Sequence, residues 1–321
     1  MQSSHQSFTG YRASLVGSVV VAAFVALATV TAPASAQSGL SFSWGKSTVG
    51  WGKVVEVQRS VAEFDGVVAA DGFHVVLRRR AEQRLTIRAD DNIEPLVVAV
   101  VEGGTLKLSM RPNISIRTSS PITVNVDYKT LRTLSLSDGV YADIDMLKSA
   151  TFKAAVRDDS KLQVAEANVN DFELSVKDGS SATVGKVMIK VSQHYKVYDG
   201  ARLTIDSANG ERVSLTVKDG ASATVLALDT KALELSVADG ARAEISGVAQ
   251  QQSYALSDAA TVNAAKLQGS AASVRASDGS SLEIGLVQAL DADVQDGSRV
   301  SYTGDPVITK RLRDGATLKW L

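Results

Sequence analysis

The sequence predicts an all-β fold in which coils of about 20 residues stack into a solenoid. An eleven-residue phrase is written three times, over residues 174–184, 215–225 and 235–245. Apolar residues alternate within each phrase, which is the period of a half-buried strand rather than of a helix. An Asp-Gly pair interrupts every phrase and indicates a turn. Because so short a unit cannot bury a core by itself, we expect the copies to stack in parallel.

One aspartate per copy keeps the register along most of the chain. Its spacing is 18 to 21 residues, and glycine follows it in eight of the ten copies. We expect the glycine to adopt a positive φ and the aspartate to bond its own backbone as an Asx-turn, because an unpaired buried carboxylate is too costly to repeat. The predicted structural turn aspartates are Asp138, Asp158, Asp178, Asp199, Asp219, Asp239, Asp258, Asp278, Asp296 and Asp314.

Two other repeat folds fit this pattern less well. Leucine-rich repeats have a similar period, but their spaced leucine and asparagine pattern is missing here. Propeller blades need about 40 residues, so odd and even copies would have to differ, and they do not.

A parallel stack would place the turn aspartates about 4.8 Å apart, where neighbouring charges repel by about 0.9 kcal/mol in water. Backbone N–H groups at the turns, with basic neighbours such as Lys177 and Lys218, are the structural explanation for how this repulsion is offset. Bound calcium is the alternative, since carboxylates are ligands of hard cations. The paired glycines of the calcium-binding nonapeptide repeat are absent, and we assign no catalytic, cofactor-binding or metal-ligating residue.

The amino terminus has the features of a secretory signal peptide. Arg12 precedes an apolar stretch at residues 15–30, and Ala34-Ser35-Ala36 provides a small-x-small cleavage site. The apolar stretch is shorter than the roughly 20 residues that a membrane-spanning helix needs. We therefore expect residues 1–36 to be removed and the mature chain to reside in the periplasm, on the cell surface or outside the cell, without an integral membrane span.

Composition limits the possible partners of the mature chain. Removing Arg12 leaves 33 basic and 35 acidic residues, so the formal net charge is −2. This balance gives no electrostatic argument for binding nucleic acid. The chain has no cysteine, so its stability must come from a core rather than from disulfides.

The expected domain organisation follows from these patterns. Residues 37–60 are predicted to be a linker or an N-terminal cap, and its duplicated Trp44-Gly45-Lys46 and Trp51-Gly52-Lys53 could alternatively form a docking peptide. The β-helix domain is expected over residues 61–321, with an irregular β part at 61–130 and Asp-Gly coils at 131–318. The terminal residues 318–321 are expected to cap the last coil, since an open solenoid end invites edge pairing.

The chain resembles the putative auto-transporter adhesin, head GIN domain family, over roughly residues 60–318. The resemblance implies a right-handed parallel β-helix in an exported bacterial protein of undefined function, with adhesion suggested by the family's name and no catalytic residues to carry over. This chain departs from the family in preferring Asp-Gly turns, and it has no room for a carboxy-terminal translocator barrel. The motifs that carry the resemblance are Phe64-Asp65-Gly66-Val67, Val75-Val76-Leu77, Leu85-Thr86-Ile87 with Arg88-Ala89-Asp90-Asp91-Asn92, Gly104-Thr105-Leu106-Lys107-Leu108 and the strand at 121–126.

These observations favour a non-catalytic interaction or adhesion scaffold that binds an unidentified surface or envelope ligand. A polysaccharide lyase or hydrolase is the first alternative, because other β-helices carry such activities. Only His74 and His194 remain after signal removal, far apart in sequence, and no pair of carboxylates stands out from the repeat. A periplasmic structural or stress factor of the envelope is the second alternative, and the sequence does not separate it from adhesion.

Overall fold

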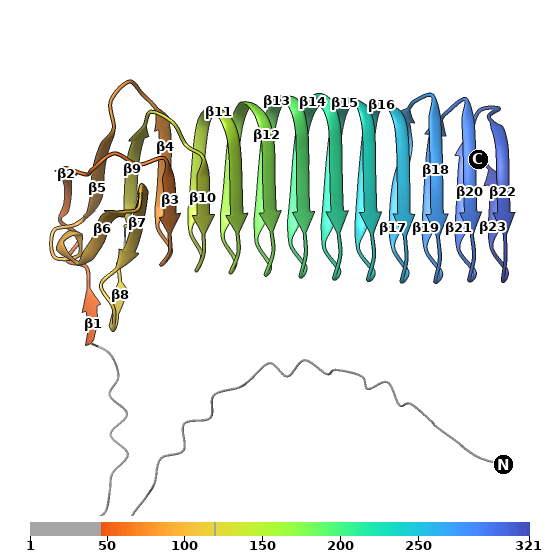
Figure 1. The fold of residues 1–321 in the computed structure, drawn as a ribbon. Helices are drawn as coiled ribbons and strands as arrows, with labels where there is room; N and C mark the ends of the chain where they lie inside the picture. Colours follow the sequence, from red (N-terminus) through yellow and green to blue (C-terminus); the bar gives the residue numbers. More distant parts are fainter. Residues whose placement is uncertain (1–45, 119) are drawn as a thin grey trace, which may run out of the picture. The chain divides into compact units, whose positions relative to one another are not determined.

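Each coil of the chain folds back on itself, so that two parallel sheets face one another across a narrow core (Figure 1). The computed structural model describes residues 46–118 and 120–321. The signal peptide expected at 1–36 and Trp44 lie outside the described residues. Of the segment predicted as a linker or cap, residues 46–60 are described, and the expected domain boundaries stay predictions.

The fold class is confirmed as a β-solenoid of about nine turns with coils of roughly 20 residues. Six long strands each pass through both sheets, bending once, and successive strands pair in parallel. Within each strand the buried and outward positions alternate on either side of the bend, as the period of two predicted. These strands are β11 (Tyr141–Val156), β12 (Lys161–Val176), β13 (Ser181–Val197), β14 (Arg202–Val217), β15 (Ser222–Val237) and β16 (Arg242–Leu256).

The later coils are divided into two shorter strands each. We call the sheet that contains residues 141–149 of β11 and their register partners the first sheet, and the sheet that contains residues 151–156 and their partners the second sheet. The first sheet continues through β17 (Thr261–Gln268), β19 (Ser281–Leu286), β21 (Arg299–Thr303) and β23 (Thr317–Trp320). The second sheet continues through β18 (Ala271–Ala276), β20 (Ala289–Val294) and β22 (Val307–Leu312).

Antiparallel strands end the parallel stack at its amino-terminal side. In the first sheet β11 pairs with β4 (His74–Arg79), β4 with β9 (Thr123–Tyr128), and then β5 (Arg84–Asp90) and β2 (Val54–Arg59) follow in antiparallel order. In the second sheet β10 (Thr133–Leu136), β3 (Gly66–Ala69) and β7 (Thr105–Met110) stack in parallel before β6 (Val97–Glu102) pairs antiparallel. The 3-10 helix η1 (Glu94–Leu96) joins β5 to β6, and β1 (Lys46–Val49) pairs with β8 (Ile114–Arg117).

The carboxy-terminal residues do not cap the last coil, so that expectation was wrong. Leu318 and Trp320 lie in β23, which pairs with β21 as the next member of the stack and leaves its other edge without a partner among the described strands. Period two continues through β23, so these residues form a rung rather than a cover.

The core is apolar, but two polar pairs are buried within it. The Tyr195 hydroxyl donates to Gln193 Oε1 at 2.9 Å, and the Tyr254 hydroxyl donates to Gln252 Oε1 at 2.7 Å. Burial raises the pKa of both tyrosines, so both phenols remain protonated donors. No helix in residues 46–118 and 120–321 is long and apolar enough to cross a membrane.

Candidate binding groove

The ten predicted turn aspartates lie together along one edge of the solenoid, at the tight turns seen at the lower edge in Figure 1. Each has φ between 48° and 57°, and the residue after it also has a positive φ. In nine of the ten turns the residue after the pair donates its N–H to the carbonyl before the aspartate, as in Ala221 to Lys218 at 3.1 Å. Two successive left-handed residues with this hydrogen bond form a type I′ turn.

The turns are stabilised by bonds between coils rather than by the expected Asx bond. The N–H of Gly220 donates to the Asp239 carbonyl of the next coil at 2.9 Å, and the corresponding bonds along the ladder measure 2.8–3.1 Å. In the described residues none of the ten carboxylates accepts a hydrogen bond from its own turn. The expectation of an Asx-turn was therefore wrong, because a type I′ turn turns the chain without help from the side chain.

The ladder carboxylates point outward, and the charges beside them change along the solenoid. Asp158 pairs with Arg157 at 3.4 Å and Asp178 with Lys177 at 3.1 Å. Four later aspartates follow neutral residues instead, namely Ala238, Ser257, Ser277 and Gln295. No group of three or more histidine, cysteine, aspartate or glutamate side chains suited to a metal ion occurs in the part of the chain that the structure describes.

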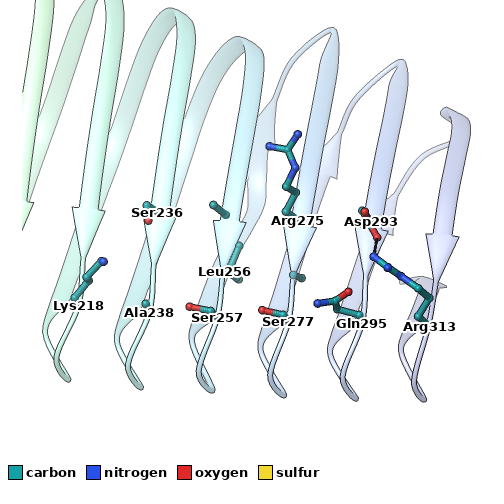
Figure 2. Close-up of a pocket in the computed structure, with 12 residues that line it drawn as sticks. Lys218, Ser236, Ala238, Leu256, Ser257, Arg275, Ser277, Asp293, Gln295 and Arg313 are labelled. Atoms are coloured by element: carbon teal, nitrogen blue, oxygen red, sulfur yellow. Dashed lines mark hydrogen bonds and ion pairs between the residues drawn. The ribbon is translucent and has the colours of Figure 1, made fainter. Parts of the chain in front are cut away.

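These neutral residues form the floor of a groove on the second sheet (Figure 2). The groove has a volume of about 390 Å³. Its floor is low because the outward position before each aspartate carries a small side chain in three successive coils, at Ala238, Ser257 and Ser277. The neighbouring outward column adds Ser236 and Ala255.

Long polar side chains surround this floor. Lys218 stands at one end and Arg275 rises beside the middle (Figure 2). At the other end Arg313 Nη2 donates to Asp293 Oδ1 at 2.8 Å. Lys218 and Arg275 form no ion pair with any residue that the structure describes, whereas Lys177 and Arg313, on the same face, are paired.

The groove offers hydrogen-bonding groups but no catalytic arrangement. The side chains of Ser236, Ser257 and Ser277 make no hydrogen bond to another described residue, so their hydroxyls face solvent as free donors and acceptors. The lining contains no histidine, and its single carboxylate, Asp293, is ion-paired. Glycoside hydrolysis needs two positioned carboxylates. The groove therefore offers hydrogen bonds to a hydroxyl-rich or amide-rich chain and lacks the carboxylate pair of a glycoside hydrolase.

The two histidines lie on different sheets. His74 Nε2 is 2.8 Å from Asp143 Oδ2 on the first sheet, where its ring stacks on Tyr141. His194 lies on the second sheet next to Glu173.

A second depression brings His194 and Glu173 together with Asp171 and Lys153. Burial raises the pKa of Glu173, but Lys153 and Lys196 more than offset this and hold the pKa below its ordinary value. A general acid needs a raised pKa. Glu173 is therefore unsuited to be the proton donor of a polysaccharide-cleaving site.

Sequence reasoning missed the groove, although its signal is visible. The residue before the turn aspartate is Arg157, Lys177, Tyr198 and Lys218 in successive copies and then becomes alanine, serine and serine. Aligning the copies on the aspartate reveals this run of small residues. That the run makes a depression depends on the longer side chains around it, including Arg275 from the neighbouring column.

The family described as putative auto-transporter adhesin, head GIN domain, matches residues 63–193 and again residues 186–306. The chain belongs to this family. The two matches of the head GIN domain together span the irregular β part and nearly all of the Asp-Gly coils. No curated protein matches the sequence.

This head GIN domain protein is similar to several solved structures. A putative adhesin from Parabacteroides merdae ATCC 43184 is 12% identical with a TM-score of 0.55, over 86% of this chain and 99% of that one. A putative adhesin from Parabacteroides distasonis ATCC 8503 is 15% identical with a TM-score of 0.48, over 86% of this chain and 100% of that one. A putative lipid binding protein from the same strain is 16% identical with a TM-score of 0.41, with the same coverage of both chains. At these identities the likeness concerns the fold alone.

Proposed function

We propose that this protein is a non-catalytic, exported interaction scaffold of the adhesion type, which acts at the bacterial cell envelope and binds its ligand along the groove of the second sheet. The observation that carries the proposal is the groove itself. Free hydroxyls and two unpaired basic side chains are presented there on a regular, rigid surface. Family membership supports the same assignment, because the family is described as an adhesin head.

The geometry of the coils supports binding rather than turnover. Coils of 18 to 21 residues leave no long loops to close over a substrate. Successive rungs repeat at about 4.8 Å, so equivalent groups are presented at regular intervals along the groove. A solenoid surface of this kind matches an extended ligand such as a polysaccharide.

Location is tested by protease shaving of intact cells, followed by blotting of the shaved and the osmotically opened fractions. Loss of the protein from intact cells supports a surface role. Protection until the envelope is opened would instead favour the alternative of a periplasmic structural or stress factor.

Ligand binding is tested with the purified mature protein on immobilised envelope and matrix polysaccharides. Ser277→Trp fills the groove floor and is expected to abolish retention. Ser214 faces outward on the same sheet and lies outside the groove lining. Ser214→Trp is therefore the matched control and should bind like the wild type. Equal binding by both variants would contradict the groove as the binding site.

The enzyme alternative is tested in the same samples. Appearance of new reducing or unsaturated ends on an acidic polysaccharide, at a rate proportional to protein concentration, would overturn the non-catalytic assignment.

A further inference from the structure

One inward-facing column of the second sheet ends in a charge. The register from β7 to β22 places eleven apolar side chains in this column, each at most 2% exposed, and Lys310 as the twelfth member after Ala292. The apolar members are Leu106, Val67, Leu134, Ala154, Leu174, Tyr195, Leu215, Leu235, Tyr254, Val274 and Ala292.

The other inward positions of the last described rung are apolar. Ile308 and Leu312 flank Lys310 on β22, and Leu318 and Trp320 occupy the inward positions of β23. Leu312 is 39% and Trp320 71% exposed, because no further rung covers them among the described residues. Apart from Lys310, this rung presents the same apolar surface on which every earlier rung stacks.

The backbone of β22 also has a free edge. The N–H groups of Val307 and Arg313 donate to Gln288 and Val294 at 2.9 and 3.0 Å. Alternate residues of a strand direct their polar groups to opposite sides. The N–H and C=O groups of Ile308, Lys310 and Leu312 therefore point away from β20, where another strand would pair with them.

We propose that Lys310 prevents a second copy of this chain from stacking on this rung. A stacked copy would enclose the ammonium group in the apolar column, above Ala292 and between Ile308 and Leu312. Lys310 forms no ion pair with the residues that the structure describes, and the nearby Asp293 carboxylate faces outward and binds Arg313. Burying an unpaired charge opposes association, whereas in the open rung the long side chain reaches solvent.

The two ends of the described solenoid thus avoid edge pairing by different means. At the amino-terminal side the edge strands are β2 and β6, and each pairs antiparallel with its neighbour. Their edges therefore do not continue the parallel rungs of the two sheets. The other side keeps a rung-like edge and protects it with one inward-pointing charge, a known device of edge strands.

The test compares substitutions at this position in the purified mature chain. Lys310→Leu completes the apolar column and is expected to form a dimer through the β22 rungs of two copies, whereas the wild type should stay monomeric, as measured by light scattering after size exclusion over a concentration series. Lys310→Pro also removes the charge but eliminates the outward N–H donor of the edge, so it should remain monomeric. Arg311→Leu removes an outward-facing charge from the same strand and should also remain monomeric.

Amide hydrogen exchange identifies the surface that associates. In the Lys310→Leu assembly, the amides of residues 308, 310 and 312 should become protected, while those of β2 keep their wild-type exchange. A Lys310→Leu protein with the wild-type mass at every concentration would overturn the proposal. So would a wild-type protein that is already associated through β22, or equal association of the Arg311→Leu control.

Discussion

The tight turns depend on which residues tolerate a left-handed backbone. Aspartate accepts this conformation more readily than most residues, and glycine accepts it without a Cβ penalty. At Ala259 an alanine adopts φ 59° where most copies have glycine. The other copy without glycine has Asp159 there, a residue type that tolerates this conformation better, so Ala259 is the most strained member of the set.

Replacing Ala259 with glycine is therefore expected to stabilise the protein by roughly 0.5–1 kcal/mol. The left-handed penalty of a Cβ exceeds the extra entropy that glycine loses on folding. The matched reverse change, Gly240→Ala, should lower the free energy of unfolding by a similar amount. Chemical denaturation of both variants measures the effect, and a destabilised Ala259→Gly would contradict this account of the turns.

The buried glutamine–tyrosine pairs give a second prediction at this scale. Tyr195→Phe leaves Gln193 Oε1 without its donor inside the core, which should cost about 1–3 kcal/mol. Tyr254→Phe repeats the experiment in another coil, with Gln252 as the orphaned acceptor. Tyr198 is only partly buried, so Tyr198→Phe serves as a control with little expected change in unfolding midpoint.

Glu173 predicts a pH dependence. Its folded pKa is held below the ordinary value of 4.5 because Lys153 and Lys196 outweigh the effect of burial. The stabilisation is therefore present above pH 4.5 and is lost as the pH falls through the folded pKa. In Glu173→Gln, the unfolding midpoint should fall less steeply than in the wild type as the pH is lowered through the acid range. An equally steep fall in both proteins would show that the two ion pairs do not contribute to acid stability.

At the scale of elements, the aspartate ladder combines backbone attraction with charge repulsion. Carbonyl-to-amide bonds at 2.8–3.1 Å link every turn to the next, and this arrangement brings the carboxylates into a row. The repulsion is offset by basic neighbours at Asp158 and Asp178 but not in the stretch from Asp239 to Asp296.

Neutralising a carboxylate should therefore have opposite effects in the two stretches. Asp258→Asn is expected to stabilise by a few tenths of a kcal/mol at low salt, and the gain should fall as salt screens the row. Asp178→Asn loses its contact with Lys177 and should be neutral or slightly destabilising. Thermal unfolding at two ionic strengths measures both. A melting curve that shifts upward with calcium and downward with chelator would show that the row binds cations.

At the scale of the whole described chain, the stability of each coil depends on its contacts with the neighbouring coils. Each coil contacts only the one before and the one after, so the end rungs have support on one side. We expect the amides of β22 and β23 to exchange fastest and those of β12 to β15 slowest in native-state hydrogen exchange. Uniform exchange along the solenoid would show that it opens as a single cooperative unit.

The fold could be predicted because a solenoid repeats one local pattern. Period-two alternation decides which side chains face inward, and an Asp-Gly pair decides where each coil turns. The sequence alone therefore determined the strands, the period of the coils and the position of the turn aspartates, Asp138 through Asp314, on one edge. The Asx-turn was mispredicted because two left-handed residues and a bond between coils are properties of the stacked backbone, which no single copy specifies.

Only the tertiary structure decided what the surface can do. The groove needs Ala238, Ser257 and Ser277 from three coils to be level and Arg275 to stand beside them, and these relations follow from register between strands. Lys310 looks like any surface lysine in the sequence, and it is exceptional only because stacking continues an apolar column up to Ala292. Local pattern determines the coil, whereas the alignment of one coil on the next determines the sites.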